Sequence, residues 1–167
     1  MKKFMLVCVI LFIANVGCKK MNVDGGGLCG CSPVESPEFN LAIRNNAGDD
    51  LLSNSSSGAY NKSNIQLYRK DAEGKAVPIV FSIRQPFSYG DEKFKYNLLF
   101  TSDIRFNPET QKDVIYLKLG DEPPYELTMQ LKPNGRYSVQ QLLIDQKEAE
   151  KGEGNLAKFV SVYYLNK

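Results

Sequence analysis

The sequence predicts an all-β protein folded as an antiparallel sandwich, and three observations support this. Apolar residues after residue 38 recur at every second position in one run after another, which is typical of strands with one buried and one solvent face. Clusters of Gly, Pro, Asn and Asp separate these runs. Except at residues 138–151, where a helix also fits the pattern, no run shows the longer helical period that a crossover helix would need, so the strands are expected to pair antiparallel.

The alternation places the expected strands in chain order. Each of the earlier runs has one apolar and one polar side, whereas the last run is apolar on both sides and is expected at the centre of a sheet. The run that begins at residue 137 is expected to end near Asp145, with a polar loop or a helical turn before Gly152. The expected strands cover residues 39–44, 65–69, 77–83, 94–101, 115–119, 125–132, 137–145 and 156–165.

The segments between the runs contain recognisable turns. Residues 71–74 end on Gly74 and connect the second strand to the third. Residues 121–124 include Pro123 and Pro124, which supply no backbone donor and separate two strands. Residues 132–135 contain Asn134-Gly135, a pair that favours a tight hairpin turn. The long polar segment 45–64 is expected to be a mobile loop.

About seven to eight strands in one domain favour an immunoglobulin-like arrangement, with a small β-barrel as the alternative. The chain has no Trp, and the expected domain has no Cys. The buried Trp and the paired cysteines of antibody domains are therefore both missing, so the likeness concerns architecture only.

The first residues have the pattern of a targeting segment and are expected to be one. Lys2 and Lys3 precede an apolar run over residues 4–14, which is far shorter than the roughly 20 residues that a membrane span needs. The run ends on Asn15-Val16-Gly17-Cys18, which resembles the end of a bacterial lipoprotein signal peptide, although Asn15 stands where an aliphatic residue is usual. The resemblance implies that residues 1–17 are removed and that Cys18 carries lipid and fatty acyl groups such as palmitate.

The same resemblance implies a place and an organisation. Lipid on Cys18 would hold the protein in the cell envelope, and Lys19 after it favours the outer membrane, on either its periplasmic or its surface face. Residues 18–38, which include Gly25-Gly26-Gly27 and two prolines, are expected to be a flexible tether. Residues 39–167 are expected to form a single domain. Cys29 and Cys31 in the tether are expected to form a disulfide, to pair with a partner or to remain thiols.

Composition excludes several function classes. The absence of His removes histidine-based triads and leaves too few ligands for zinc, so neither a metal nor a cofactor is expected. Loss of Lys2 and Lys3 with the signal leaves 19 of the 21 basic residues against 19 acidic ones, so nucleic acid is not an expected partner. Three carboxylate pairs are expected to be solvated turn residues: Asp49-Asp50, Asp91-Glu92 and Asp121-Glu122.

The remaining prediction is a non-catalytic binding or accessory module. Aromatic residues expected in loops are the candidate contacts with an envelope protein or a glycan, namely Tyr60, Phe87, Tyr89 and Tyr125. The alternative is a small envelope hydrolase that acts on a glycan or a peptide through the loop carboxylates.

Overall fold

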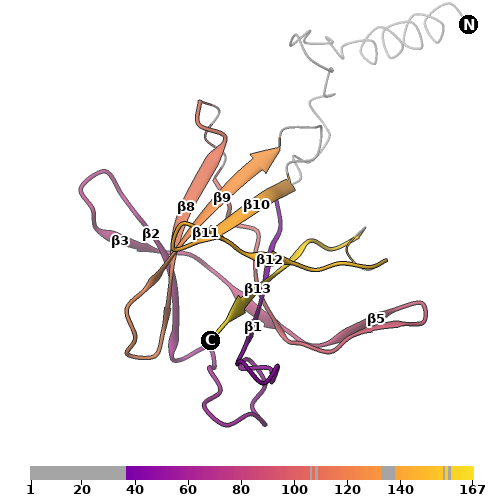
Figure 1. Ribbon diagram of the computed structural model, residues 1–167. Helices are drawn as coiled ribbons and strands as arrows, with labels where there is room; N and C mark the ends of the chain where they lie inside the picture. The colour runs from indigo at the N-terminus through magenta and orange to yellow at the C-terminus, as the bar shows by residue number, and fades with distance from the viewer. Residues whose placement is uncertain (1–36, 106, 108, 133–137, 156, 158) are drawn as a thin grey trace, which may run out of the picture. The chain divides into compact units, whose positions relative to one another are not determined.

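The computed structural model describes residues 37–167 apart from 106, 108, 133–137, 156 and 158, and these residues belong to one compact unit, Glu35–Lys167 (Figure 1). The predicted signal peptide, the lipidation residue Cys18, Cys29, Cys31 and the Asn134-Gly135 turn lie outside the described residues. Within the described part of the chain, no helix is both long and apolar enough to cross a membrane.

The fold is all-β, with two larger sheets and one separate hairpin. Every strand pair is antiparallel except the first and the last strand, which run parallel side by side. Neither larger sheet closes on itself, so the alternative of a small barrel is wrong. The five-stranded sheet has the order β12 (Glu150–Lys151), β13 (Val162–Asn166), β1 (Phe39–Arg44), β7 (Leu98–Thr101) and β4 (Ser82–Arg84). The six-stranded sheet has the order β11 (Lys147–Glu148), β10 (Ser138–Ile144), β9 (Tyr125–Lys132), β8 (Lys112–Leu119), β2 (Ile65–Lys70) and β3 (Ala76–Pro78), and the hairpin joins β5 (Phe87–Tyr89) to β6 (Glu92–Phe94).

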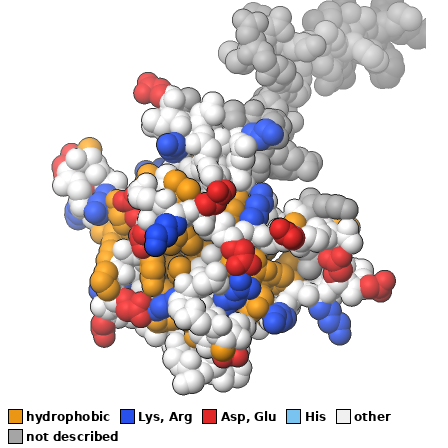
Figure 2. All heavy atoms as spheres, in the orientation of Figure 1, with side chains coloured by type: hydrophobic (Ala, Val, Ile, Leu, Met, Phe, Trp, Pro, Cys, Tyr) orange, Lys and Arg blue, Asp and Glu red, His pale blue; other side chains and the backbone are white. Residues whose placement is uncertain are grey.

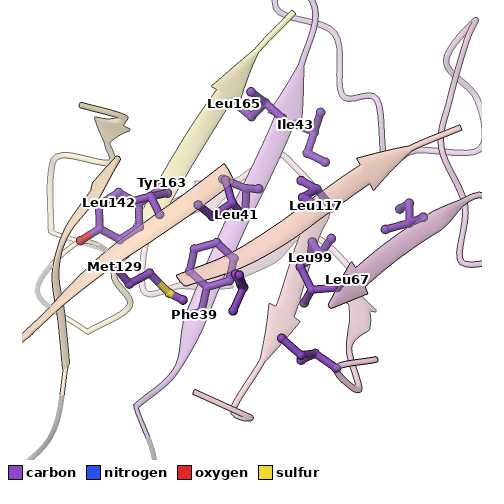
Figure 3. Close-up of a cluster of buried hydrophobic side chains, with 14 of the residues drawn as sticks. Phe39, Leu41, Ile43, Leu67, Leu99, Leu117, Met129, Leu142, Tyr163 and Leu165 are labelled. Atoms are coloured by element: carbon purple, nitrogen blue, oxygen red, sulfur yellow. The ribbon is translucent and has the colours of Figure 1, made fainter. Parts of the chain in front are cut away.

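One apolar core holds the two larger sheets together. Figure 3 shows Phe39 and Leu41 of β1 close to Leu117 of β8, Met129 of β9 and Leu142 of β10. Alternate residues of β8 and β9 are buried, as the sequence predicts. Fully burying each such side chain contributes about 1.5–3 kcal/mol. The described residues contain no cysteine, so no disulfide supports this core.

β1 differs from its prediction because both of its faces are buried. The side expected to be solvent-exposed includes Asn40, which is 1% exposed, and Ala42, which is 0% exposed. A second apolar cluster covers this side, and Phe87 and Phe94 of the β5–β6 hairpin contribute to it. Their rings stack with centroids 5.5 Å apart. The sequence pattern of β1 could not reveal a cover that comes from a hairpin about fifty residues away in the chain.

Two expected strands are broken. Residues 77–83 divide into β3 and β4 because the chain crosses from one sheet to the other, which leaves Val80 82% exposed at the crossing. Residues 94–101 divide into β6 and β7, and Leu99 faces the main core while Leu98 joins the second cluster. The side of β7 expected to be buried, which includes Leu98, is therefore buried, and the side expected to face solvent, which includes Thr101, is buried as well.

Three further expectations have mixed outcomes. β13 lies inside its sheet as predicted, but it begins only at Val162. β10 ends at Ile144, and a tight turn at Asp145 and Gln146, both with positive φ, replaces the expected loop or helical turn and leads into β11. Segment 45–64 is fastened to the core, because its Leu51 and Leu52 are buried there.

Candidate functional site

A groove of about 820 Å³ lies beside β2 and β3 and next to the turn between β8 and β9. We call it the edge groove. Figure 2 shows hydrophobic side chains gathered on the surface in this region, left of the centre, with charged side chains around them. Its apolar lining includes Ile65, Leu67, Pro78, Ile79, Phe81, Pro123 and Pro124, and its polar lining includes Gln66, Lys70, Lys118, Asp121 and Glu122.

The groove exists because β3 covers only part of β2. β3 pairs with Tyr68–Lys70, and the backbone N–H of Ile79 then donates to the Leu67 carbonyl at 2.8 Å before the chain leaves for the other sheet. On the side of β2 away from β8, Ile65 and Gln66 therefore have no strand neighbour among the described residues.

The β8–β9 turn forms the opposite wall. Gly120 has a φ of 57°, which favours glycine, and its N–H donates to the Asn64 carbonyl at 2.8 Å. Pro123 and Pro124 follow and stiffen the turn. The wall is thus held to the start of β2 by backbone bonding.

Three polar side chains meet at Glu122, which also lines the groove. The Lys167 ammonium donates to both Glu122 oxygens at 2.6 Å. The Tyr60 hydroxyl donates to Oε1 at 3.1 Å and the Tyr125 hydroxyl to Oε2 at 3.4 Å. Lys167 Nζ also donates to the Tyr60 hydroxyl oxygen. We call these four residues the Glu122 cluster.

The cluster keeps its charges at neutral pH. The hydrogen bond from Lys167 lowers the pKa of Glu122 below its ordinary value, against the effect of burial. Burial opposes the charged form of Lys167, yet hydrogen bonds to Glu122 and Tyr60 raise its pKa. Glu122 is therefore a poor proton donor, and Lys167 is not a neutral amine nucleophile.

The groove also carries lysines without a carboxylate partner. Among the described residues, no acidic side chain forms an ion pair with Lys70 or Lys118. The Lys70 ammonium lies 4.4 Å from the Tyr116 ring centroid, and this ring stacks on Tyr68 with centroids 5.4 Å apart. Lys167 matches the charge of Glu122, which leaves Asp121 as the one further acid, against two lysines, among the described residues that line the groove.

The four aromatic contacts predicted from the sequence occupy two separate places. Tyr60 and Tyr125 meet in the Glu122 cluster beside the edge groove. Phe87 is half-buried in the second apolar cluster. Tyr89 is 54% exposed on the hairpin, and its ring centroid is 4.4 Å from that of Phe159.

The expectation that the carboxylate pairs are merely solvated turn residues is wrong in part. Asp50 Oδ2 accepts hydrogen bonds from the backbone and the side-chain nitrogen of Asn97, both at 2.7 Å. Glu92 Oε1 accepts one from the Asn155 amide at 2.7 Å. Glu122 forms the cluster described above. Within the described residues, no three His, Cys, Asp or Glu side chains gather as metal ligands would.

No known family can be named for this chain. No family model matches the sequence, and neither a curated protein nor a solved structure gives a significant match.

Sequence reasoning missed most of the groove. The sequence predicts only a break between strands at Pro123 and Pro124, and it predicts no role for Lys118. The proline pair beside two acids was the one local signal of a rigid wall. No sequence pattern brings Ile65 next to a turn more than fifty residues away.

Proposed function

We propose that the protein is a lipid-anchored lipoprotein of the bacterial cell envelope whose domain binds a protein or a glycan and catalyses no reaction. Two features support the anchor and the place: the Asn15-Val16-Gly17-Cys18 ending, and Lys19 after it. A tether of some twenty residues would give the domain a reach of roughly 25 Å from an outer membrane. As part of the same proposal we assign the two-sheet domain to the immunoglobulin-like sandwiches, supported by the chain crossing repeatedly between its sheets.

The observation that carries the binding function is the edge groove. Its volume of about 820 Å³ lies within the range of roughly 300–1,000 Å³ that is usual for ligand sites. Apolar walls with a few charged groups are the usual composition of such sites. The acid in the groove whose contacts are known, Glu122, is ionised and already bonded to Lys167, which supports binding over hydrolysis.

The anchor is tested by labelling cells with a palmitate analogue. Labelled protein is expected from the wild type and from Cys29→Ser, and no label is expected from Cys18→Ser. Cys29→Ser is the matched control because it removes a thiol from the tether without touching the cleavage motif. Label retained in Cys18→Ser would refute the anchor.

The binding function is tested by photocrosslinking in intact cells. A photoreactive amino acid is placed at Gln66, which is exposed in the groove, or at Lys112, which is exposed on the same sheet outside it. A discrete adduct is expected from position 66 and none from position 112. Equal adducts from both positions, or none from position 66, would reject the edge groove as the contact site.

A further inference from the structure

We infer that the edge groove receives an extended peptide segment in which an aliphatic or proline side chain stands next to a carboxylate, and that Lys118 pairs with this carboxylate. The inference rests on the proposed binding function and names the class of partner. Three features of the groove support it, and they come from different parts of the fold.

The first feature is the apolar wall. Ile65 and Phe81 line one part of the groove, and Pro123 and Pro124 line another. A glycan is covered with hydroxyl groups, and burying these groups without hydrogen-bond partners costs free energy. An aliphatic or proline side chain buries apolar surface against such walls and loses no hydrogen bonds to water. The lining therefore suits an apolar peptide side chain better than a sugar ring.

The second feature is the unpaired positive charge. Lys118 and Lys70 have no carboxylate partner among the described residues, whereas Glu122 is already bonded to Lys167. A carboxylate brought in by a partner would therefore not have to displace an internal ion pair. Lys118 is the better placed of the two lysines, because it is paired in register with Gln66 next to the uncovered part of β2.

The third feature is the part of the β2 backbone that no strand pairs among the described residues. The Leu67 carbonyl faces the side away from β8, since it accepts from Ile79. Ile65 lies two residues earlier in the same strand, so its N–H and C=O face the same side. No strand covers them in the described part of the chain. An extended peptide can bond to these groups, whereas the acyl chain of a fatty acid cannot.

The experiment measures binding of labelled peptides to the purified full chain by fluorescence anisotropy. The probe is an eight-residue peptide that alternates isoleucine and glutamate around a central proline, and its counterpart carries lysine in place of glutamate. The acidic peptide is expected to bind about tenfold more tightly, because the counterpart replaces an attraction by a repulsion. Lys118→Glu is expected to reverse this order, and Lys118→Gln to reduce the difference.

Lys112→Glu is the matched control, since it makes the same charge change on the same strand and the same face outside the groove. It is expected to leave the order unchanged, and thermal unfolding of each variant shows that it is folded. The inference would be overturned if the relative affinity of the two peptides did not depend on the charge at position 118. Binding of a neutral oligosaccharide or of laurate in place of the peptides would also overturn it, while the binding function would stand. If no probe binds, both are overturned.

Discussion

Lys167 and Glu122, which are 45 residues apart in the chain, form an ion pair in which the ammonium donates to both carboxylate oxygens at 2.6 Å. Glu122 lies in the β8–β9 turn that walls the edge groove, and Lys167 follows β13 of the other sheet. The backbone N–H of Lys167 also donates to the Arg44 carbonyl at 2.9 Å. The pair thus ties the groove wall to the five-stranded sheet.

Removing either partner of this pair is expected to destabilise the protein modestly. The Glu122 side chain is 45% exposed, so solvent screens the interaction, and Glu122→Gln or Lys167→Met is expected to cost about 1 kcal/mol or less. A double-mutant cycle in urea is expected to show coupling between the two sites. Asp121→Asn is the neighbouring control, and it is expected to show no coupling to Lys167→Met.

The same pair predicts a dependence on acid. Because the pKa of Glu122 is lower in the folded state than its ordinary value of 4.5, its contribution to stability is complete above that value. The contribution is lost as the pH falls through the folded-state pKa. Urea unfolding at several acidic pH values is therefore expected to show a shallower loss of stability in Glu122→Gln than in the wild type. Equal slopes would contradict the pKa shift.

Asp50 is expected to matter far more than its neighbour Asp49. Asp50 Oδ2 accepts two hydrogen bonds from Asn97, which is only 5% exposed, and Asp50 Oδ1 accepts the N–H of Leu52 at 2.9 Å. Asp50→Ala leaves these donors without a partner and is expected to cost about 2 kcal/mol in chemical denaturation. Asp49→Ala removes only an exposed contact with Asn45, and a cost as large as that of Asp50→Ala would refute this assignment.

Tyr163 is expected to control part of the unfolding at high pH. Burial raises its pKa to about 12, and its hydroxyl donates to the Val139 carbonyl at 3.1 Å. The neutral side chain therefore adds stability that is complete below the ordinary value of 10 and is lost as the pH rises towards about 12. Tyr163→Phe is expected to cost about 1 kcal/mol at neutral pH and to unfold less steeply between these values. Circular dichroism at increasing pH measures both effects.

Ala42 tests whether both faces of β1 are covered. A lysine at this position would place its charge among the apolar side chains of the second cluster, so Ala42→Lys is expected to cost 3 kcal/mol or more, roughly. Gln66→Lys is the control, since it introduces the same charge at an exposed strand position and is expected to change stability by about 0.5 kcal/mol or less. A tolerated Ala42→Lys would mean that the outer face of β1 is open to water.

The local pattern predicted the strands whose environment is simple. β8 and β9 each have one neighbour sheet and one solvent face, so the burial of every second residue follows from the alternation alone. β1 and β7 have a second cover from the β5–β6 hairpin, and there the alternation predicts solvent exposure for Ala42 and Thr101, which are both buried. The alternation of apolar residues indicates that one face of a strand is buried. It carries no information about whether the other face is also covered.

The candidate site was predictable only in fragments. The abundance of aromatic residues pointed to Tyr60 and Tyr125, but their shared partner Glu122 was taken for a solvated turn residue. Lys167 lies two residues beyond the last expected strand, 156–165, and the sequence predicts no role for it. Whether a charged residue is buried or paired depends on residues that are distant in the sequence. A local sequence pattern does not contain this information.

The sequence by itself determined the β class, the turns at residues 71–74 and 121–124, the absence of histidine and the grounds for expecting a lipid anchor, because each depends on residue type or on neighbours along the chain. Only the tertiary structure decided which strands are covered twice, where β2 is left partly uncovered, and which charges stay unpaired. These features depend on side chains that lie far apart in sequence and meet only when both sheets close over one core.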